Sequence, residues 1–311
     1  MTPLAKFIVL SIVALPLAGQ ATELTTSKAV LVTGASTGIG RKVTERLAAD
    51  GYFVYAGARK EEDLKALGAI KNVQAVRLDV TQLQDIDAVV ETIKKGRRGL
   101  YGLVNNAGIA TVGSLADMKP EEFDLVMAVN VYGPYRVTKA VEPLIIADKG
   151  RITNIGSISG ILANSNLTAY SMSKHSIEAF TDSLAQQLIG LGVVVNVVEP
   201  GNYNSEIGKN ALQRLGKQPQ ATDPAAYQLS ADRSKYKEPE EVADAVEKAL
   251  FEPNPKRRYM VVPNQDEAEV TIKKQIVQLV QLNEGQPYTY DRATLVKMLD
   301  DALAQSRPKT K

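Results

Sequence analysis

Apolar residues in this chain fall into short runs of the strand type that alternate with longer stretches of helical spacing. The strand-like runs lie near residues 28–33, 52–58, 73–78, 101–105, 151–156, 193–198 and 258–262. The first is β-branched and apolar without alternation, as expected of a strand buried on both faces. Alternating strands and helices predict an α/β fold with a doubly wound parallel sheet of about seven strands and helices on both faces.

Two further segments are expected to lie beside this sheet. The helical pattern after Tyr170 continues to about Gly190, with apolar residues spaced for packing at Ile177, Phe180, Leu184 and Leu188. Residues 202–237 then turn polar and contain Gly, Pro and isolated apolar residues such as Leu212, Leu215 and Tyr227. Because binding segments usually lie on loops over a rigid scaffold, we expect a mobile lid and substrate loop here.

Residues 264–311 follow the core, which we assign to residues 24–263, and are expected to form two helices. Asn264 can cap the first, which ends near Gly285. Its apolar face would comprise Val270, Ile272, Ile276, Val277, Val280 and Leu282. The second would start after Asp291 and bury Leu295, Met298 and Leu299. We expect a C-terminal helical extension packed on the core, for stability or oligomer contact, with a role at the substrate entrance as the alternative.

The first 21 residues have the pattern of a secretory signal peptide. A positively charged start, residues 1–6, precedes an apolar run at residues 7–18 and small residues suited to cleavage. The apolar run is short for a membrane span, and no twin arginine is present. The pattern predicts export to the periplasm or another non-cytoplasmic compartment. Membrane association through an uncleaved anchor at residues 7–18 is the alternative.

A glycine-rich turn directly follows the first predicted strand. It reads Thr33-Gly34-Ala35-Ser36-Thr37-Gly38-Ile39-Gly40 and leads into a helix-like run. Strand, glycine turn and helix place a pyrophosphate at a helix N-terminus, where free N–H groups point at it. Glycines are needed because a side chain would keep the backbone away from the phosphate. We therefore expect Gly34, Ser36, Thr37, Gly38, Ile39 and Gly40 to bind a dinucleotide in a Rossmann-type fold.

Tyr170 and Lys174 are four residues apart, and Ser157 precedes the tyrosine by thirteen residues. On a helix, a four-residue step brings the phenol and the ammonium group onto one face. A tyrosine alone titrates near pH ~10. A nearby positive charge favours the phenolate and lowers that pKa toward working pH, as general acid–base catalysis requires. The pair therefore predicts a tyrosine acid–base site.

The composition removes several competing classes of protein. The 311 residues include no cysteine and a single histidine, His175, so a Cys/His zinc cluster cannot be built and no metal site is expected. Ser157 has neither a Gly-x-Ser-x-Gly elbow nor a histidine partner, which disfavours a serine hydrolase. A net charge of +2 without a basic stripe argues against nucleic-acid binding.

Further motifs complete a family pattern. With the glycine turn and the Tyr170/Lys174 pair, the segments Asn105-Asn106-Ala107-Gly108 and Pro200-Gly201, together with Asn130 and Ser157, make the chain resemble the short-chain dehydrogenase/reductase family. The resemblance covers about residues 28–263. Within the family, Gly156-Ser157-Ile158-Ser159-Gly160 and Val198-Glu199-Pro200-Gly201 are most similar to the retinol and 17β-hydroxysteroid dehydrogenase branch.

The resemblance implies roles for the individual residues. Asp79 and Val80 would lie against the adenine, Asn106, Ala107 and Gly108 would line the cofactor, and Pro200, Gly201 and Tyr203 would contact the nicotinamide. Ser157 would hydrogen-bond the reacting oxygen and stabilise the charge that develops there. Lys174 would also hold the ribose, and Asn130 would hold a water of a proton relay. A homodimer or homotetramer, paired through the helix after Tyr170, is likewise implied.

The end of the second predicted strand bears on the choice of nicotinamide cofactor. In dinucleotide folds, an acidic residue here binds the ribose 2′-hydroxyl, whereas an arginine accommodates a 2′-phosphate. Ala58 stands where NAD-preferring relatives carry aspartate, and Arg59 follows it. A guanidinium suits a phosphate because its planar fork can donate two hydrogen bonds at once. The sequence therefore favours NADP(H), with NAD(H) as the alternative.

Taken together, these features predict an oxidoreductase that interconverts an alcohol and a ketone or aldehyde by hydride transfer. The branch resemblance favours a lipophilic substrate, retinoid-like or steroid-like, and an acyl-thioester ketone is the alternative. A non-catalytic dinucleotide-sensing protein is the alternative from another class. Such proteins usually lose the tyrosine or the lysine, whereas this chain keeps both.

Overall fold

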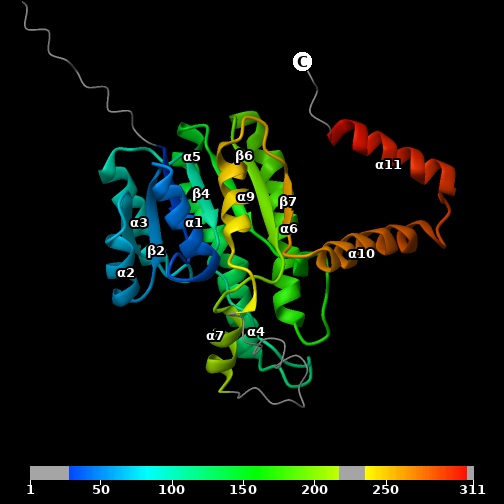
Figure 1. Cartoon of the computed structure of the whole chain (residues 1–311), viewed down its shortest axis with the longest axis horizontal. Helices are drawn as coiled ribbons and strands as arrows, with labels where there is room; N and C mark the ends of the chain where they lie inside the picture. The colour runs from blue at the N-terminus through cyan, green and yellow to red at the C-terminus, as the bar shows by residue number, and fades with distance from the viewer. Residues whose placement is uncertain (1–27, 217–234, 307–311) are drawn as a thin grey trace, which may run out of the picture.

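The computed structural model describes residues 28–216 and 235–306. Within them, seven strands form one parallel sheet in the order β3-β2-β1-β4-β5-β6-β7 (Figure 1). The strands are β1 Ala29–Val32, β2 Phe53–Ala58, β3 Val73–Arg77, β4 Gly102–Asn105, β5 Arg151–Ile155, β6 Val194–Pro200 and β7 Arg258–Val261. Every predicted strand is present with its ends within two residues of the expected ones, so the predicted fold class is confirmed.

The sequence pattern of β1 follows from its place at the centre of the sheet. Leu31 lies opposite Tyr55 of β2 on one side and Leu103 of β4 on the other. All four residues of β1 are buried, and alternate residues enter different cores because successive strand side chains point to opposite faces. Both faces need apolar side chains, so the strand shows no alternation of polar and apolar residues.

Helices cover both faces of the sheet. On one face lie α1 Gly38–Ala49, α2 Glu61–Gly68 and α9 Glu240–Phe251, and on the other lie α3 Leu83–Gly96, α5 Tyr132–Ala147 and α6 Thr168–Leu188. The predicted helix after Tyr170 is confirmed as α6, whose residues Ile177, Leu184 and Leu188 are buried. A further helix, α4 Pro120–Asn130, packs against α5 and α6. The short 3₁₀ turns η1 Ile158–Gly160 and η2 Ile189–Leu191 follow β5 and α6.

The polar segment after β6 is partly helical, so the prediction of a loop throughout residues 202–237 is wrong. Helix α7 spans Ile207–Leu215, and residues 217–234, which include Tyr227, lie outside the described part of the chain. Arg214 of α7 donates hydrogen bonds to the Glu122 carboxylate at 3.1 Å and to the Ala110 carbonyl at 2.6 Å. These two contacts fasten α7 to α4 and to the segment after β4, an arrangement that local sequence composition does not reveal.

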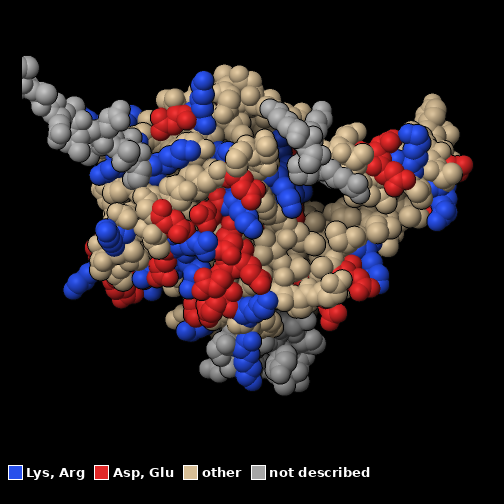
Figure 2. All heavy atoms as spheres, turned by 45° about the horizontal axis from the view of Figure 1, so that its top comes forward, with Lys and Arg blue, Asp and Glu red and all other residues tan. Residues whose placement is uncertain are grey.

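The C-terminal extension consists of α10 Gln265–Asn283 and α11 Arg292–Ser306. The predicted cap is confirmed, because the Asn264 side chain accepts a hydrogen bond from the Glu267 N–H at 2.9 Å. The predicted packing on the core is wrong. Both helices project from the body in Figure 1, and Figure 2 shows the same arm in a tilted view.

Most apolar side chains of α10 and α11 are exposed, whereas the predicted packing required them to be buried. Thr271 is the one buried residue of α10, whereas the side chains of its predicted apolar face are exposed, Ile276 by 54% and Leu282 by 77%. Leu299 of α11 is exposed by 58%. The Glu267 carboxylate accepts a hydrogen bond from the Asn202 N–H at 2.9 Å, so α10 meets the body at its first turn, and most of its apolar residues lie beyond this contact.

The predicted signal segment, residues 1–21, lies outside the described residues. Among the helices of residues 28–216 and 235–306, none is both long enough and apolar enough to cross a membrane. The cleavage or anchoring of residues 1–21 stays a prediction from the sequence.

Candidate active site

A cavity of about 1260 Å³ opens at the carboxyl ends of the central strands. It lies where the strand order reverses between β1 and β4, the usual ligand site of an open α/β sheet. Its wall contains the predicted cofactor residues Gly34, Ser36, Thr37, Gly38, Ile39, Gly40, Arg59, Asp79, Val80, Asn106, Ala107, Gly108, Pro200, Gly201 and Tyr203, and the predicted catalytic residues Ser157, Tyr170 and Lys174. The fold thus brings these separate segments together at one cavity.

The glycine turn between β1 and α1 is packed too closely for side chains. Gly34 has a φ of +65°, and a Cβ there would lie 2.8 Å from the Ala107 Cα. A Cβ at Gly40 would overlap with the Gly34 carbonyl and the Asn106 amide. At the N-terminus of α1, Thr37 makes no side-chain capping hydrogen bond, so the first-turn N–H groups are free of that competitor. This turn is built to accept an anion on its backbone.

Thr33, which the sequence analysis did not single out, joins this turn to the end of β4. Its hydroxyl oxygen accepts hydrogen bonds from the N–H groups of Asn106 and Ala107, each at 3.0 Å. In return, the Asn106 side-chain amide donates to the carbonyls of Thr33 and Gly34 at 2.9 Å. The reciprocal bonds hold two cofactor-lining segments in register, which explains why an asparagine follows β4.

Arg59 and Asp79 lie at the rim of the same cavity, after β2 and β3. The Arg59 guanidinium is 3.7 Å from the Asp79 carboxylate, and the arginine side chain is 66% exposed. Burial opposes ionisation of Asp79, but hydrogen bonds from Thr81 and the charge of Arg59 hold its pKa below the usual value. Asp79 is therefore charged and lies within ion-pair distance of the guanidinium.

Lys174 lies one helical turn after Tyr170 on α6, as the spacing predicted. Its ammonium group is 5.6 Å from the centre of the Tyr170 ring and donates a hydrogen bond to the Ile155 carbonyl at 2.8 Å. Burial lowers the pKa of Lys174 to about 8, and the nearby Glu178 carboxylate acts in the opposite direction. Lys174 is therefore a buried cation whose pKa lies only slightly above neutral pH.

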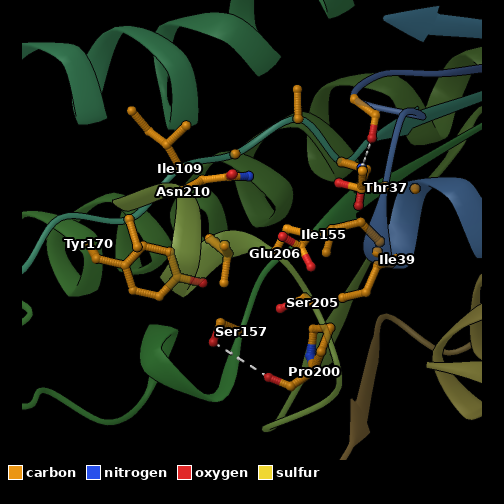
Figure 3. Close-up of a pocket in the computed structure, with 18 of the residues that line it drawn as sticks. Thr37, Ile39, Ile109, Ile155, Ser157, Tyr170, Pro200, Ser205, Glu206 and Asn210 are labelled. Carbon is orange, nitrogen blue, oxygen red and sulfur yellow. Dashed lines mark hydrogen bonds between the residues drawn. The ribbon is translucent and has the colours of Figure 1, made fainter. Parts of the chain in front are cut away.

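Ser157 follows β5 and faces Tyr170 across the cavity. Its hydroxyl donates to the Pro200 carbonyl at 3.4 Å and accepts from the Ser159 N–H at 3.0 Å. Figure 3 shows the hydroxyls of Ser157 and Tyr170 pointing into the same part of the cavity. Two hydroxyl groups with a buried cation behind one of them can hydrogen-bond a single carbonyl or alcohol oxygen and exchange a proton with it.

Two of the predicted residues make contacts that the sequence did not suggest. Asn130 lies outside the cavity wall, where its side chain bonds to the N–H and the carbonyl of Ile109 at 2.9 and 2.8 Å and donates to Ser173 at 3.0 Å. It ties α4 to α6, and its water-holding role stays a prediction. Tyr203 is 1% exposed and donates its hydroxyl proton to Glu241, so its phenol is turned to the core.

The cavity wall also contains residues that the sequence did not assign to the site. The polar ones come from the loop before α6, from α7 and its approach, and from the base of α10: Asn164, Ser165, Asn166, Asn202, Ser205, Glu206, Asn210, Gln213, Arg214 and Glu267. The apolar ones include Ile109, Ala110, Ile158, Leu162, Leu167, Ile207, Tyr236 and Val270. The base of α10 thus reaches the cavity, as the alternative interpretation of the extension proposed. Over residues 28–216 and 235–306, no group of His, Cys, Asp or Glu is arranged to hold a metal ion.

Known proteins share this sequence pattern. A family model described as short chain dehydrogenase matches residues 28–216. D-beta-hydroxybutyrate dehydrogenase, mitochondrial, from Bos taurus is 40% identical over 57% of this chain and 54% of that protein. Retinol dehydrogenase 5 from Mus musculus is 36% identical over 57% of each chain. NADPH-dependent 3-dehydrocapnine reductase from Ornithobacterium rhinotracheale is 34% identical over 75% of this chain and 87% of the relative. The match thus spans little more than half the length of the first two relatives.

Solved structures share the fold. A short chain dehydrogenase/reductase from Burkholderia phymatum in complex with NAD aligns over 85% of this chain and 98% of its own, with a TM-score of 0.73 and 23% identity. A variant of actinorhodin polyketide ketoreductase with NADPH aligns over 76% of this chain and 95% of its own, with a TM-score of 0.66 and 29% identity. The first likeness concerns the fold alone, and the two neighbours carry different forms of the nicotinamide dinucleotide.

Proposed function

The chain belongs to the short-chain dehydrogenase family of NAD(P)-dependent oxidoreductases acting on CH–OH groups, and from this premise we propose that Tyr170 is its general acid and base and NADP(H) its cofactor. The observation that carries the proposal is the convergence of Ser157, Tyr170 and Lys174 on the cavity that also holds the glycine turn.

The cradle around the glycine turn fits a dinucleotide. A side chain at Gly34 or Gly40 would clash with Ala107 or Asn106, so the backbone there can approach a pyrophosphate closely. The uncapped start of α1 supplies N–H donors for it. When bound, the nicotinamide supplies or accepts the hydride. Pro200 and Gly201, which line the cavity beside Ser157, would support the nicotinamide end.

Tyr170 would donate its proton to a ketone oxygen during reduction and accept it from an alcohol during oxidation. Ser157 would hydrogen-bond the same oxygen and stabilise its developing charge. The ammonium group of Lys174, held by the Ile155 carbonyl, favours the charged form of the phenol through space. A cation at 5.6 Å from the ring is well placed for this because burial keeps water from screening it.

The preference for NADP(H) rests on Ala58 and Arg59. Both line the cavity, and no carboxylate occupies the Ala58 position to repel a 2′-phosphate or to bind a 2′-hydroxyl. The guanidinium of Arg59 is solvent-accessible and can turn to a phosphate while remaining near Asp79. The relative with NADPH in its name, 3-dehydrocapnine reductase, also supports this choice.

For the substrate, the polar residues of the cavity wall support an alcohol or ketone with several hydrogen-bonding groups. Asn164, Asn166, Asn210 and Gln213 offer both donors and acceptors there. An apolar ligand would leave these polar groups without hydrogen bonds, and this loss would reduce the binding free energy. A lipophilic, retinoid-like substrate is the second candidate, and the similarity to retinol dehydrogenase 5 favours it.

The test is a carbonyl panel assayed with NADPH and NADH, comparing hydroxy- and keto-acid, acyl-thioester and retinoid or steroid substrates. Turnover of polar ketones, lost in Tyr170→Phe, would support the proposal. NADPH binding with no turnover of any compound would favour a dinucleotide-sensing protein. Turnover of retinoids or steroids alone would overturn the inference of a polar substrate.

A further inference from the structure

A pair of buried carboxyl groups lies behind the active site and plays no part in the chemistry described so far. Glu199 is near the end of β6 and 2% exposed, and Glu178 is on α6 with its side chain 14% exposed. The charged groups around the pair are Lys174 and Asp182 on α6 and Arg258 on β7. The Arg258 Nε atom is 3.2 Å from the Glu178 Oε2 atom and 3.6 Å from the Glu199 Oε1 atom.

This surrounding does not satisfy two carboxylates. Among the described residues, the Oε1 atoms of Glu178 and Glu199 are both buried without a hydrogen bond, and the Arg258 Nε atom is too far from Glu199 to make one. Part of the charge of Arg258 is also taken by Asp182, whose carboxylate is 2.7 Å from the guanidinium. A proton on one carboxyl group would supply the missing donor and remove one of the two buried charges.

The ionisation tendencies of the two groups agree with this geometry. Burial, together with the neighbouring Glu178, raises the pKa of Glu199 to about 8. Burial also raises the pKa of Glu178, but Arg258 opposes that effect at closer range. The proton therefore belongs mainly to Glu199 at neutral pH, and the negative charge belongs to Glu178.

The pair is linked to the active site at three points. A Cβ at Gly156 would lie 2.9 Å from the Glu178 Oε1 atom, and one at Gly160 would lie 3.2 Å from its Cγ atom, so the segment carrying Ser157 rests on this side chain. Glu178 also lies one helical turn after Lys174, and its charge favours the ammonium form of that lysine. Glu199 directly precedes Pro200, whose carbonyl accepts the Ser157 hydrogen bond.

We propose that Glu178 and Glu199 share one proton beneath the Ser157 segment and that the charge left on Glu178 keeps Lys174 cationic. The part that concerns Lys174 rests on the proposed function. Both glutamates are positioning residues, because neither lines the cavity and both act through Lys174 and Ser157.

The first test is the pH profile of ketone reduction in Glu178→Gln, with Asp182→Asn as the control. Both changes remove a carboxylate bonded to Arg258, but only Glu178 acts on Lys174. In Glu178→Gln, Lys174 should lose its proton at lower pH, so the alkaline limb of kcat/KM should move down by at least about half a pH unit. The Asp182→Asn control should show the same alkaline limb of kcat/KM as the unmodified protein. Equal limbs in all three proteins would overturn the role of Glu178 toward Lys174.

The second test needs no substrate and so stands even if the proposed function fails. A folded-state pKa of about 8 for Glu199 exceeds the unfolded value of ~4.3, so the folded state binds the proton more tightly. The contribution of Glu199 to the stability of the unmodified protein should therefore fall as pH rises from ~4.3 to about 8. The side chain of the Glu199→Gln variant cannot ionise. The thermal midpoint of this variant minus that of the unmodified protein should therefore increase by several degrees between pH 5 and pH 8. A difference that does not change with pH would overturn the shared proton.

Discussion

Replacing Arg59 by alanine should weaken NADPH binding and leave NADH binding almost unchanged. The guanidinium lies at the cavity rim after β2, where a 2′-phosphate would be placed, and it lies 3.7 Å from the Asp79 carboxylate. NADH carries a hydroxyl in place of the 2′-phosphate, so loss of the Arg59 charge removes no ion pair with NADH. The substitution thus separates a phosphate contact from a general disturbance of the site.

The size of the effect follows from the exposure of the guanidinium. Two unit charges at ~4 Å interact by ~1 kcal/mol in water and by ~4 kcal/mol at an effective dielectric of 20. The Arg59 side chain is 66% exposed and Asp79 competes for it, so the lower end applies. A loss of about 1–2 kcal/mol corresponds to a roughly 5- to 30-fold higher dissociation constant for NADPH. For NADH we expect a change within about twofold.

The assay is a fluorescence or calorimetric titration of each cofactor at constant salt, since salt screens an exposed charge. Arg77→Ala is the matched control. Arg77 is similarly exposed, at 62%, and it contacts Arg59 only through the main-chain carbonyl, outside the cavity wall. Equal losses for NADPH and NADH, or an equal effect of the control, would refute the assignment of Arg59 to the phosphate.

Three further changes test the rest of the site. Tyr170→Phe should lower kcat by about 10²–10⁴-fold while cofactor titrations stay unchanged, since only the proton carrier is lost; a variant with more than a tenth of the original rate would contradict its role. Gly40→Ala should cost about 1–3 kcal/mol in denaturant unfolding, because its Cβ would overlap with the Gly34 carbonyl. The control Gly190→Ala, with open space around the added Cβ, should be nearly neutral, and similar midpoints would refute the packing argument. Deleting residues 285–311 should leave the thermal midpoint and cofactor affinity unchanged, since no described residue of α11 is buried; a clear loss would show that α11 supports the core.

Much of the architecture could be predicted from local sequence. A strand buried on both faces needs apolar residues at consecutive positions, and a turn beneath a pyrophosphate needs backbone without side chains, so both leave short, recognisable patterns. The Tyr170/Lys174 pair is also local, because four residues on one helix determine the distance between the two side chains. These features are determined by covalent spacing and by burial, which is why the structure agrees with them.

Other features depend on contacts between distant segments. Helix α7 lies in a polar stretch and is held by Arg214 against Glu122, ninety-two residues away in the chain. The apolar residues of α10 predict a packed helix, yet Ile276 and Leu282 are exposed, and the helix is joined to the body near its start, where Glu267 accepts a hydrogen bond from Asn202. In the same way, Glu178, Glu199 and Arg258 look like ordinary charged residues until α6, β6 and β7 bring them together. A side chain's pKa and its partners are properties of its three-dimensional surroundings. The sequence therefore determined the elements and the spacing of Tyr170 and Lys174, and only the tertiary structure decided which charges are buried beside them.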